Sequence, residues 1–313
     1  MERDDERAPV AAIERVAVVG AGTMGWQIAA LVAGSGRRVS LFDALPGAAA
    51  RAVTRMRTEL PPVIAGGAFP PGQVDADALV ARVALPDTLA AAVGDADLVI
   101  EAVREEIATK RAVFADLSRL APGAMLATNS SSLPSSVVAD VVDAPGRLLN
   151  LHFFSPVWER PMLEVMGCGA TRPEVLSAGV AFGRSLGLVT ATVRGESKGF
   201  IINRIWRAVK RESLRVVDEG HADPEDVDRL WMNFFGTASG PFGIMDMVGL
   251  DVVADIEASY IAVATDPADR ESPTLRRMVE AGRLGEKSGD GFYHHPDPAY
   301  REPEFRRGKS RPE

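Results

Sequence analysis

The feature that most constrains the fold of this chain is a glycine-rich turn between an apolar strand and an alanine-rich helix. The segment VAVVGAGTMGWQIA carries Gly20, Gly22 and Gly25 in the GxGxxG spacing. In such a turn the first glycine permits the tight bend, the second leaves room for a pyrophosphate, and the third lets the helix pack closely on the strand. The N-terminus of the helix then faces the phosphates. The segment therefore predicts a dinucleotide-binding α/β domain, although a turn of this shape can also exist without a ligand.

An acidic residue follows the next predicted strand. The run RVSLF ends immediately before Asp43, at the separation from the glycine turn where a carboxylate accepts hydrogen bonds from the adenosine ribose. No arginine directly follows Asp43, so a ribose 2′-phosphate would be repelled. We therefore expect NAD rather than NADP, bound by the turn with Thr23 and Met24 and by Asp43.

The first two thirds of the chain alternate short β-branched runs with longer helical stretches. This alternation predicts an α/β fold, with a doubly wound, mostly parallel sheet covered by helices on both faces, as in a Rossmann domain. The runs read as continuous apolar segments, as expected for parallel strands buried on both faces. Strands are predicted at 15–20, 38–42, 96–102, 124–128, 148–152, 163–167 and 188–193, and a helix at 107–120.

After about Gly195 the strand pattern stops and a smaller all-helical region follows. The segment 198–219 carries apolar residues on one side and is followed by Gly220, a typical helix-ending residue. Asp223 is then expected as an N-cap, with Pro224 at the first helical position. Further helices are predicted at 248–264 and 273–281. The expected divisions are a flexible tail (1–12), an NAD-binding domain (13–195), a helical substrate and dimerisation domain (196–295) and a loosely ordered tail (296–313).

The composition excludes several classes of function. A net charge of -8 at 313 residues argues against nucleic acid and polybasic membrane contacts. The single cysteine, Cys168, excludes an intrachain disulfide and a cysteine-rich zinc site, so no metal is expected and a reducing compartment is favoured. No apolar run is long enough to span a bilayer, and the N-terminus does not resemble a targeting peptide. These features predict a cytoplasmic protein.

Polar residues follow two further predicted strands, where ligands bind in open α/β sheets. LVIEAVREEIATK supplies Glu101, Glu105 and Lys110, although acids in a first helical turn are also favoured by the helix dipole alone. ATNSSSLPSS supplies Asn129 and the serines at 130–132, which are able to bind a substrate oxygen or to cap a helix.

The stretch LHFFSPVWERPMLEV contains the strongest candidate for proton transfer. His152 ends one apolar run and Glu164 lies in the next, and a carboxylate beside an imidazole fixes the ring tautomer and stabilises the imidazolium. Spacing alone does not distinguish this role from that of a half-buried histidine satisfied by a neighbouring acid.

Taken together, eight motifs resemble the L-3-hydroxyacyl-CoA dehydrogenase family, over roughly Val16 to Tyr293. They are GAGTMG, Asp43 after the second strand, IEAVREE with Lys110, TNSSSLP, HFFSPVWERPMLEV, KGFIINRI, GPFGIMDMVGLD and GRLGEKSGDGFY. The resemblance implies a Rossmann domain, a helical domain that usually dimerises, and NAD-dependent oxidation of a short-chain 3-hydroxyacyl-CoA, such as 3-hydroxybutyryl-CoA, to its 3-oxo form.

The resemblance also implies roles for individual residues. His152 matches the family's catalytic histidine and Glu164 its carboxylate partner. Ser131 matches the serine that hydrogen-bonds the reacting oxygen, and Asn203 the asparagine near the substrate carbonyl. The expected contacts with the nicotinamide end of NAD are Ala102, Glu105, Lys110, Asn129 and Ser155.

The chain departs from the family pattern between the two catalytic matches. Ser155 replaces the family's asparagine and offers a single hydroxyl in place of an amide. Trp158, Glu159 and Arg160 add bulk and charge to a loop that is expected to shape the acyl pocket. The helix after Asp43 carries arginines at 51, 55 and 57, which either reach CoA phosphates or form a solvated face.

Two alternatives therefore stay open. One is the same chemistry on a non-CoA alcohol, such as a carrier-protein-bound acyl group, a sugar acid or a carnitine-like substrate. The other is a non-catalytic NAD-binding protein built on this fold.

Overall fold

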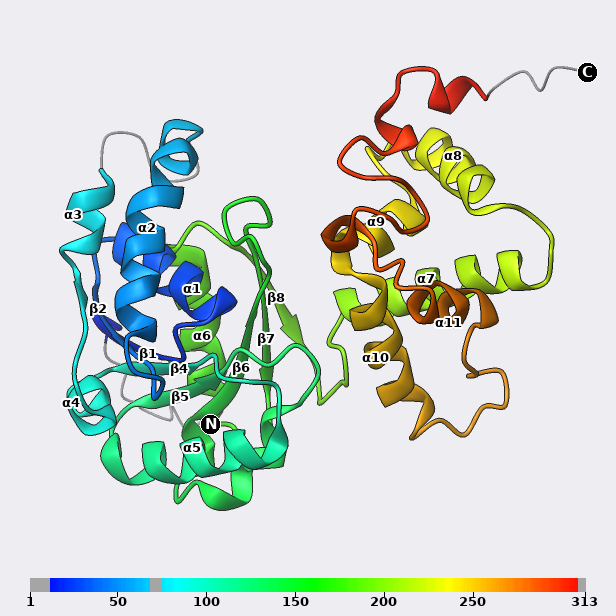
Figure 1. Cartoon of the computed structure of the whole chain (residues 1–313). Helices are drawn as coiled ribbons and strands as arrows, with labels where there is room; N and C mark the ends of the chain where they lie inside the picture. The colour runs from blue at the N-terminus through cyan, green and yellow to red at the C-terminus, as the bar shows by residue number, and fades with distance from the viewer. Residues whose placement is uncertain (1–11, 68–74, 309–313) are drawn as a thin grey trace, which may run out of the picture. The chain divides into compact units, whose positions relative to one another are not determined.

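The computed structural model describes residues 12–67 and 75–308, and the chain divides into two compact units between Asn203 and Arg204 (Figure 1). The division falls later than the predicted position after Gly195. Its physical basis is that the backbone N–H groups of Ile201 and Ile202 still donate hydrogen bonds into the sheet unit, to Glu164. The predicted flexible tail at 1–12 lies, apart from residue 12, outside the described residues.

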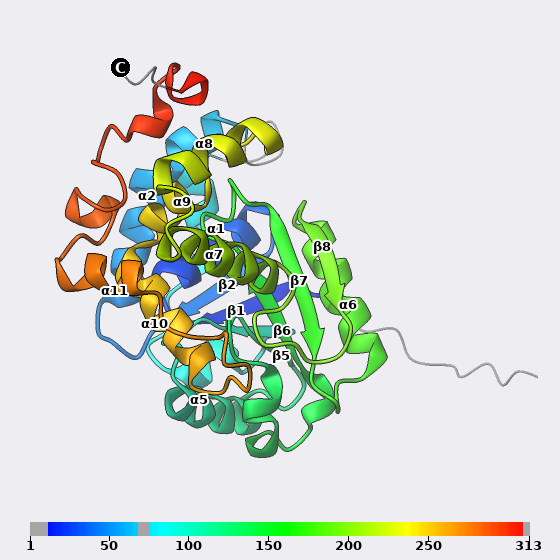
Figure 2. The same cartoon turned by 90° about the vertical axis from the view of Figure 1, so that its right-hand side faces the viewer.

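The first unit is built on one eight-stranded sheet with the order β3-β2-β1-β4-β5-β6-β7-β8. All neighbouring strands are parallel except β6 and β7, which are antiparallel and lie side by side in Figure 2. This confirms the predicted mostly parallel sheet; the two-residue β3 was too short to be predicted. The strands are β1 (Arg15–Val19), β2 (Arg38–Phe42), β3 (Val83–Ala84), β4 (Leu98–Glu101), β5 (Met125–Thr128), β6 (Leu148–Phe153), β7 (Met162–Gly167) and β8 (Val189–Val193).

Helices cover both faces of this sheet, as Figure 1 shows. Along β1, Val16 and Val18 enter one apolar core while Ala17 and Val19 enter the other, because successive side chains of a strand point to opposite faces. The first core includes side chains of α1, α2, α3 and α6, and the second includes side chains of α4 and α5. The helices are α1 (Thr23–Gly34), α2 (Ala48–Ala65), α3 (Ala76–Val80), α4 (Leu89–Val93), α5 (Ile107–Leu120) and α6 (Pro173–Ser185).

The last strand of the sheet, β8, is an exception to the predicted burial. Val189 is 70% exposed, and only Val193 of this strand is buried. The expectation that every strand is buried on both faces is wrong here, because β8 lies at the edge of the sheet.

The second unit is all-helical, as predicted. Its core is formed by side chains such as Leu214, Met232, Phe242 and Leu275. The helices are α7 (Ile202–Asp218), which begins at the end of the first unit, α8 (Pro224–Phe235), α9 (Pro241–Val248), α10 (Leu250–Ile261) and α11 (Pro273–Glu280).

Two details of the helix boundaries differ from the sequence expectations. Helix α7 begins at Ile202 and not at Lys198, because Gly199 and Phe200 have φ values of 78° and 54°, which are incompatible with a right-handed helix. Asp223 occupies the N-cap position of α8, but its side chain makes no capping hydrogen bond.

The segment after Pro296 belongs to the helical core, so the prediction of a loosely ordered tail is wrong for residues 296–308. Short 3₁₀ turns form at Ala299–Arg301 and Phe305–Arg307. Tyr300 and Phe305 are 5% and 7% exposed and pack in the core, where both rings contact the Tyr293 ring. Apolar burial thus outweighs the Pro, Arg and Glu content that suggested a solvated tail.

Among the described residues, none of the helices is long and apolar enough to cross a membrane. Within those same ranges there is also no group of three or more His, Cys, Asp or Glu side chains that could hold a metal ion.

Candidate active site

The glycine turn lies at the reversal point of the sheet order. β1 pairs with β2 on one side and β4 on the other, so the carboxyl ends of β1 and β4 form the crevice where open α/β sheets bind ligands. Gly20 follows β1 with φ +105°, and a Cβ there would lie 2.5 Å from the carbonyl oxygen of Ala102, which follows β4. Only a glycine permits this approach of the two strand ends.

The other two glycines fit a dinucleotide for different reasons. A Cβ on Gly25 would overlap the carbonyl oxygen of Gly20, so this glycine sets the packing of α1 on the turn. Gly22 is the N-cap of α1, and a Cβ there would meet nothing within 4 Å. The space beside Gly22 and the exposed Thr23 therefore fits a pyrophosphate at the N-terminus of the helix.

Asp43 is fixed against this turn at the end of β2. Its Oδ2 accepts a hydrogen bond from Ala21 N (2.7 Å) and its Oδ1 accepts one from Leu45 N (2.8 Å). These bonds leave lone pairs on both oxygens, so the carboxylate is oriented and still able to accept from ribose hydroxyls.

His152 and Glu164 are directly opposite each other in the antiparallel β6–β7 pair. His152 Nδ1 lies 2.8 Å from Glu164 Oε2, and the two side chains are 3% and 4% exposed. The sheet register thus joins the two residues that the sequence separates by twelve positions, at the same edge as the glycine turn.

The Glu164 carboxylate is held from its other side by backbone amides. Glu164 Oε1 accepts hydrogen bonds from Ile201 N (3.0 Å) and Ile202 N (2.9 Å) at the start of α7. Burial acts to raise the pKa of Glu164, but the hydrogen bonds from His152 and from these amides outweigh it, and the pKa lies below its ordinary value. Glu164 is therefore a stable anion beside the ring.

Two aromatic rings enclose the imidazole. The ring centroid of His152 lies 4.4 Å from that of Phe154 and 4.8 Å from that of Phe200. Phe200 is buried with a positive φ of 54°, a conformation that is strained for a bulky residue and that often marks functional sites. Phe200 lies within the KGFIINRI motif, but nothing in the local sequence predicts that its ring meets His152.

A buried ion-pair network lies at the end of β4. Glu101 is fully buried and accepts hydrogen bonds from Lys110 Nζ (2.8 and 3.0 Å), Thr128 Oγ1 (2.7 Å) and Val103 N (2.7 Å). Lys110 Nζ also lies 3.1 Å from Glu105 Oε2. The interpretation of these acids as solvated first-turn residues is therefore wrong for Glu101.

Lys110 itself is 2% exposed, with its ammonium group between two carboxylates. In the structure this ammonium group pairs with Glu101 and Glu105, and the contact of Lys110 with the cofactor stays a prediction. Burial acts to raise the pKa of Glu105, but Lys110 and hydrogen bonds from Ser130 and Ser132 outweigh it, and the pKa is lowered.

The polar residues that follow β5 have different roles: some hold neighbouring side chains in place, and one is exposed. Ser130 and Ser132 both donate to Glu105 Oε1. Asn129 Oδ1 accepts from Phe153 N (3.0 Å), which ties this loop to the strand of His152. Ser131 is exposed, and its carbonyl oxygen accepts a hydrogen bond from Asn203 Nδ2 (3.3 Å). The structure thus brings Ser131 and Asn203 together.

The largest side chain of the loop at 154–161, that of Trp158, packs against the sheet unit. The ring centroid of Trp158 lies 5.3 Å from that of Trp26 on α1, and Trp158 packs against the first core. Trp158 thus packs against α1, and the role of its loop in shaping the acyl pocket stays a prediction. Glu159 is exposed, and the Arg160 guanidinium donates to the carbonyl oxygen of Ser155.

The arginines of α2 are largely engaged within the protein. Arg55 pairs with Glu59 (2.8 Å) and lies over the Trp26 ring, and Arg57 lies 3.6 Å from Asp77. These contacts agree better with a charged surface face than with a free basic cluster.

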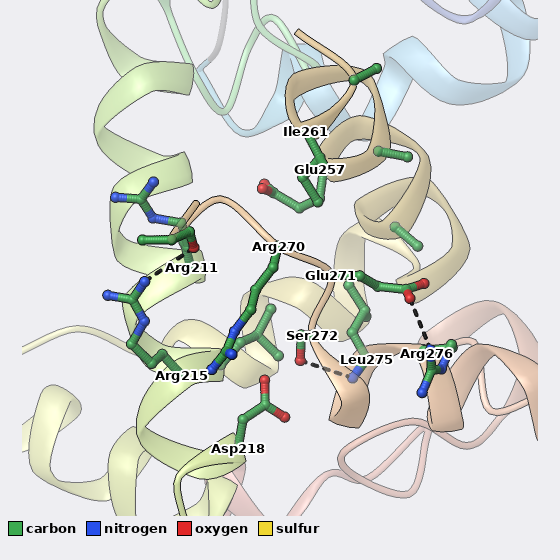
Figure 3. A pocket seen from close by; sticks show the side chains of 15 residues that line it. Arg211, Arg215, Asp218, Glu257, Ile261, Arg270, Glu271, Ser272, Leu275 and Arg276 are labelled. Carbon is green, nitrogen blue, oxygen red and sulfur yellow. Dashed lines mark hydrogen bonds and ion pairs between the residues drawn. The ribbon is translucent and has the colours of Figure 1, made fainter. Parts of the chain in front are cut away.

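The helical unit contains a pocket of about 360 Å³ between α7, α10, α11 and the preceding segment 268–272 (Figure 3). Apolar side chains such as Leu214, Ile261 and Leu275 line it, and most charges at its wall are already paired: Arg211 with Asp269, and Arg276 with Glu271 (3.1 Å). None of the sequence-predicted site residues lines this pocket, and the paired charges do not indicate a particular ligand.

A doubly wound sheet with a glycine turn for a dinucleotide, and a buried His–Glu pair at the same edge, define a nicotinamide-dependent dehydrogenase. Comparisons with known proteins specify the family. Residues 15–196 match the model of the 3-hydroxyacyl-CoA dehydrogenase NAD-binding domain, and residues 199–295 match the model of the C-terminal domain. The chain belongs to the 3-hydroxyacyl-CoA dehydrogenase family and is an NAD-dependent enzyme of that family.

Individual relatives cover nearly the whole chain. The 3-hydroxybutyryl-CoA dehydrogenase of Mycobacterium tuberculosis is 36% identical over 287 residues, which is 90% of this chain and 98% of the relative. The structure of (S)-3-hydroxybutyryl-CoA dehydrogenase from Ralstonia eutropha superposes with a TM-score of 0.83 at 29% identity, covering 91% of this chain and all of that one. A 5-formyl-3-hydroxy-2-methylpyridine 4-carboxylate 5-dehydrogenase of Mesorhizobium japonicum is 30% identical over 285 residues, 90% of each chain.

Proposed function

We propose that this enzyme interconverts a short-chain 3-hydroxyacyl-CoA, of the 3-hydroxybutyryl-CoA type, and the corresponding 3-oxoacyl-CoA. The observation that carries the proposal is the buried His152–Glu164 pair at the same edge of the sheet as the glycine turn. The names of the relatives from M. tuberculosis and R. eutropha support the substrate class.

In the proposed reaction His152 moves the proton of the substrate hydroxyl. Its Nδ1 faces the Glu164 carboxylate, an acceptor, so Nδ1 carries the hydrogen and Nε2 is the nitrogen that accepts the hydroxyl proton. Glu164 stabilises the resulting imidazolium and is itself held by the two amides of α7. The glycine turn and Asp43 would hold NAD, which would supply the acceptor for the hydride that leaves C3.

The remaining site residues are proposed to orient the reactants. Ser131 would donate to the reacting oxygen, and Asn203, which holds the Ser131 carbonyl, would lie near the thioester carbonyl. For the cofactor, the turn at 20–25 would hold the pyrophosphate and Asp43 the adenosine ribose. Ala102, Glu105, Asn129 and Ser155 would contact the nicotinamide end, with Lys110 supporting Glu105.

The direct test is His152→Ala, assayed by NADH absorbance with acetoacetyl-CoA. We expect kcat to fall by about 10²- to 10⁴-fold, the usual contribution of a positioned acid–base group. NADH affinity and thermal stability, measured on the same preparation, should stay close to wild type. A folded, NADH-binding variant with near-full activity would falsify the proposed role of His152.

A second candidate is the same chemistry on a non-CoA alcohol. Arg55 and Arg57, the arginines considered as partners of CoA phosphates, already pair with neighbouring acids. In addition, the name of the M. japonicum relative gives a pyridine carboxylate as its substrate. Both observations support a substrate without CoA. Turnover should be compared between acetoacetyl-CoA, the carrier-protein thioester and free acetoacetate. Saturable turnover of the CoA ester that exceeds the others removes this candidate.

Family membership already favours an enzyme over the non-catalytic alternative.

We also propose a homodimer that forms through the helical unit. The side chains of Leu230 and Phe234 on α8 are 70% and 83% exposed, and they border an apolar groove with Val209, Val216 and Phe235. Exposed large apolar side chains that gather along one groove are typical of an interface. Light scattering should give twice the chain mass of 33.3 kDa, and Phe234→Glu should give the monomer. A monomeric wild-type protein at micromolar concentration would contradict this proposal.

We further propose a cytoplasmic location. The chain has one cysteine, Cys168, which is buried and unpaired, as is usual in a reducing compartment.

A further inference from the structure

The loop between His152 and Glu164 is fastened to the cofactor helix by a side chain that the dehydrogenase motifs do not include. Gln27 lies on α1, two residues after the last glycine of the motif, and is 4% exposed. Its Oε1 accepts a hydrogen bond from Val157 N (3.1 Å), and its Nε2 lies 3.1 Å from Ser155 Oγ. One carboxamide thus holds two positions of the loop.

The direction of the Ser155 hydrogen bond follows from this arrangement. Ser155 Oγ also donates to Gln27 Oε1 over a longer distance, 3.4 Å, and the same oxygen accepts from Val157 N at 3.1 Å. In the shorter of the two contacts, Gln27 Nε2 donates and Ser155 Oγ accepts. Because its bond to Gln27 Oε1 is long, the Ser155 O–H is able to turn to a stronger acceptor on a ligand while Ser155 Oγ still accepts from Gln27 Nε2.

A second contact holds the same two elements together. Trp26, the residue before Gln27, is 1% exposed, and its ring packs between the ring of Trp158 and the Arg55 guanidinium. Its Nε1 has no hydrogen-bond partner among the described residues, so packing alone holds the indole. The loop is thus anchored to α1 at both Ser155 and Trp158.

We propose that Gln27 is a positioning residue for the dehydrogenase reaction. It directs the O–H of Ser155 toward an acceptor on the bound nicotinamide cofactor and ties the loop after His152 to the helix that binds the pyrophosphate. The inference rests on the proposed contact of Ser155 with the cofactor. It assigns to Gln27 an effect on cofactor binding that passes through Ser155.

The test is a double-mutant cycle read by NADH fluorescence titration. Gln27→Met keeps the length of the side chain and removes both hydrogen bonds, and Ser155→Ala removes the hydroxyl. We expect each single variant to raise the Kd for NADH by about five- to tenfold, the value of one hydrogen bond. Both variants lose the bond from Gln27 to Ser155, and with it the directed bond from the Ser155 O–H to the cofactor. The double variant should therefore bind NADH little worse than either single variant.

A steady-state readout separates positioning from general destabilisation. Gln27→Met should raise the KM for NADH while the KM for acetoacetyl-CoA stays within about twofold, since a lost cofactor contact acts on one substrate only. Ser118→Ala is the matched control, because Ser118 is also buried in the sheet unit and exchanges two hydrogen bonds with Asp143, away from α1 and the loop. It should lower the unfolding temperature without changing either KM.

A second variant keeps the inference testable if Gln27→Met does not fold. Gln27→Glu preserves the shape and the acceptor for Val157 N but presents an acceptor to Ser155, so it should draw the serine O–H away from the cofactor and raise the Kd for NADH. NADH affinity within twofold of wild type in Gln27→Glu or Ser155→Ala, or effects that multiply in the double variant, would overturn the proposal. If the wild type binds NADH but does not reduce acetoacetyl-CoA, the substrate assignment fails while this titration still decides the role of Gln27.

Discussion

At the scale of single residues, the chemistry depends on a carboxylate that is both buried and fully satisfied. A buried charge is costly unless it is paired and hydrogen-bonded. Glu164 meets this condition through the His152 ring and the amides of Ile201 and Ile202. One side chain thus orients the proposed base and also satisfies the first N–H groups of α7, which lack partners within the helix.

The lowered pKa of Glu164 predicts how stability depends on pH. A carboxyl group whose pKa is lowered by folding adds unfolding free energy above its ordinary pKa of 4.5, and this contribution is lost as the pH falls through the lower folded value. Glu164→Gln does not titrate, so it should be less stable than wild type at pH 7, and the difference should shrink by pH 4. Urea unfolding at both pH values measures it, and a difference that is the same at both would contradict the prediction.

At the scale of elements, the turn between β1 and α1 assigns a separate physical task to each glycine. Gly25 makes room for backbone, while Gly22 faces open space at the N-terminus of α1. Gly25 is therefore required for folding, and Gly22 for binding the ligand.

A pair of alanine substitutions separates these two tasks. Gly25→Ala should lower the unfolding free energy by about 1 to 3 kcal/mol or more, because its methyl group would overlap the carbonyl oxygen of Gly20. Gly22→Ala should cost less than about 1 kcal/mol, the scale of a changed N-cap. It should nevertheless weaken NADH binding by about tenfold or more, since a lost bond to a phosphate costs about 1.5 to 3 kcal/mol. Urea unfolding and NADH titration read the two effects, and equal stability losses would refute the assignment.

At the scale of the whole molecule, the chain divides into a sheet unit and a helical unit, each with its own core. The helical unit needs residues beyond the last family motif to complete its core. Phe305 is buried there, its backbone oxygen accepts from Arg229 Nε (2.8 Å), and the Arg229 guanidinium lies over its ring.

The contribution of this C-terminal segment is measurable. Phe305→Ala should destabilise the helical unit by about 3 to 5 kcal/mol, the usual cost of removing a buried aromatic ring. Val263→Ala is the control, because Val263 is 69% exposed and its truncation should change stability by no more than about 0.5 kcal/mol. Urea unfolding followed by circular dichroism compares them. A loss for Phe305→Ala no larger than that of the control would show that the segment is dispensable.

Local patterns predicted the parts of this protein that depend on neighbours in the sequence. The spacing of the glycines, the apolar runs of the strands and the helix at 107–120 all follow from backbone sterics and short-range periodicity. The same reasoning failed for the segment after Pro296, where composition suggested a tail and long-range burial of Tyr300 and Phe305 determined the outcome.

The sequence by itself therefore determined the class of fold, the cofactor and the family. Each of these depends on short motifs, and the residues of a short motif interact mainly with their neighbours in the chain. Only the tertiary structure decided which side chains meet. The β6–β7 register pairs His152 with Glu164, burial removes Lys110 from solvent and leaves it supporting Glu105, and Gln27 reaches a loop more than a hundred residues away. The physical reason is that sheet pairing and core packing set the burial and the distances of these side chains, and a local sequence pattern contains no information about either.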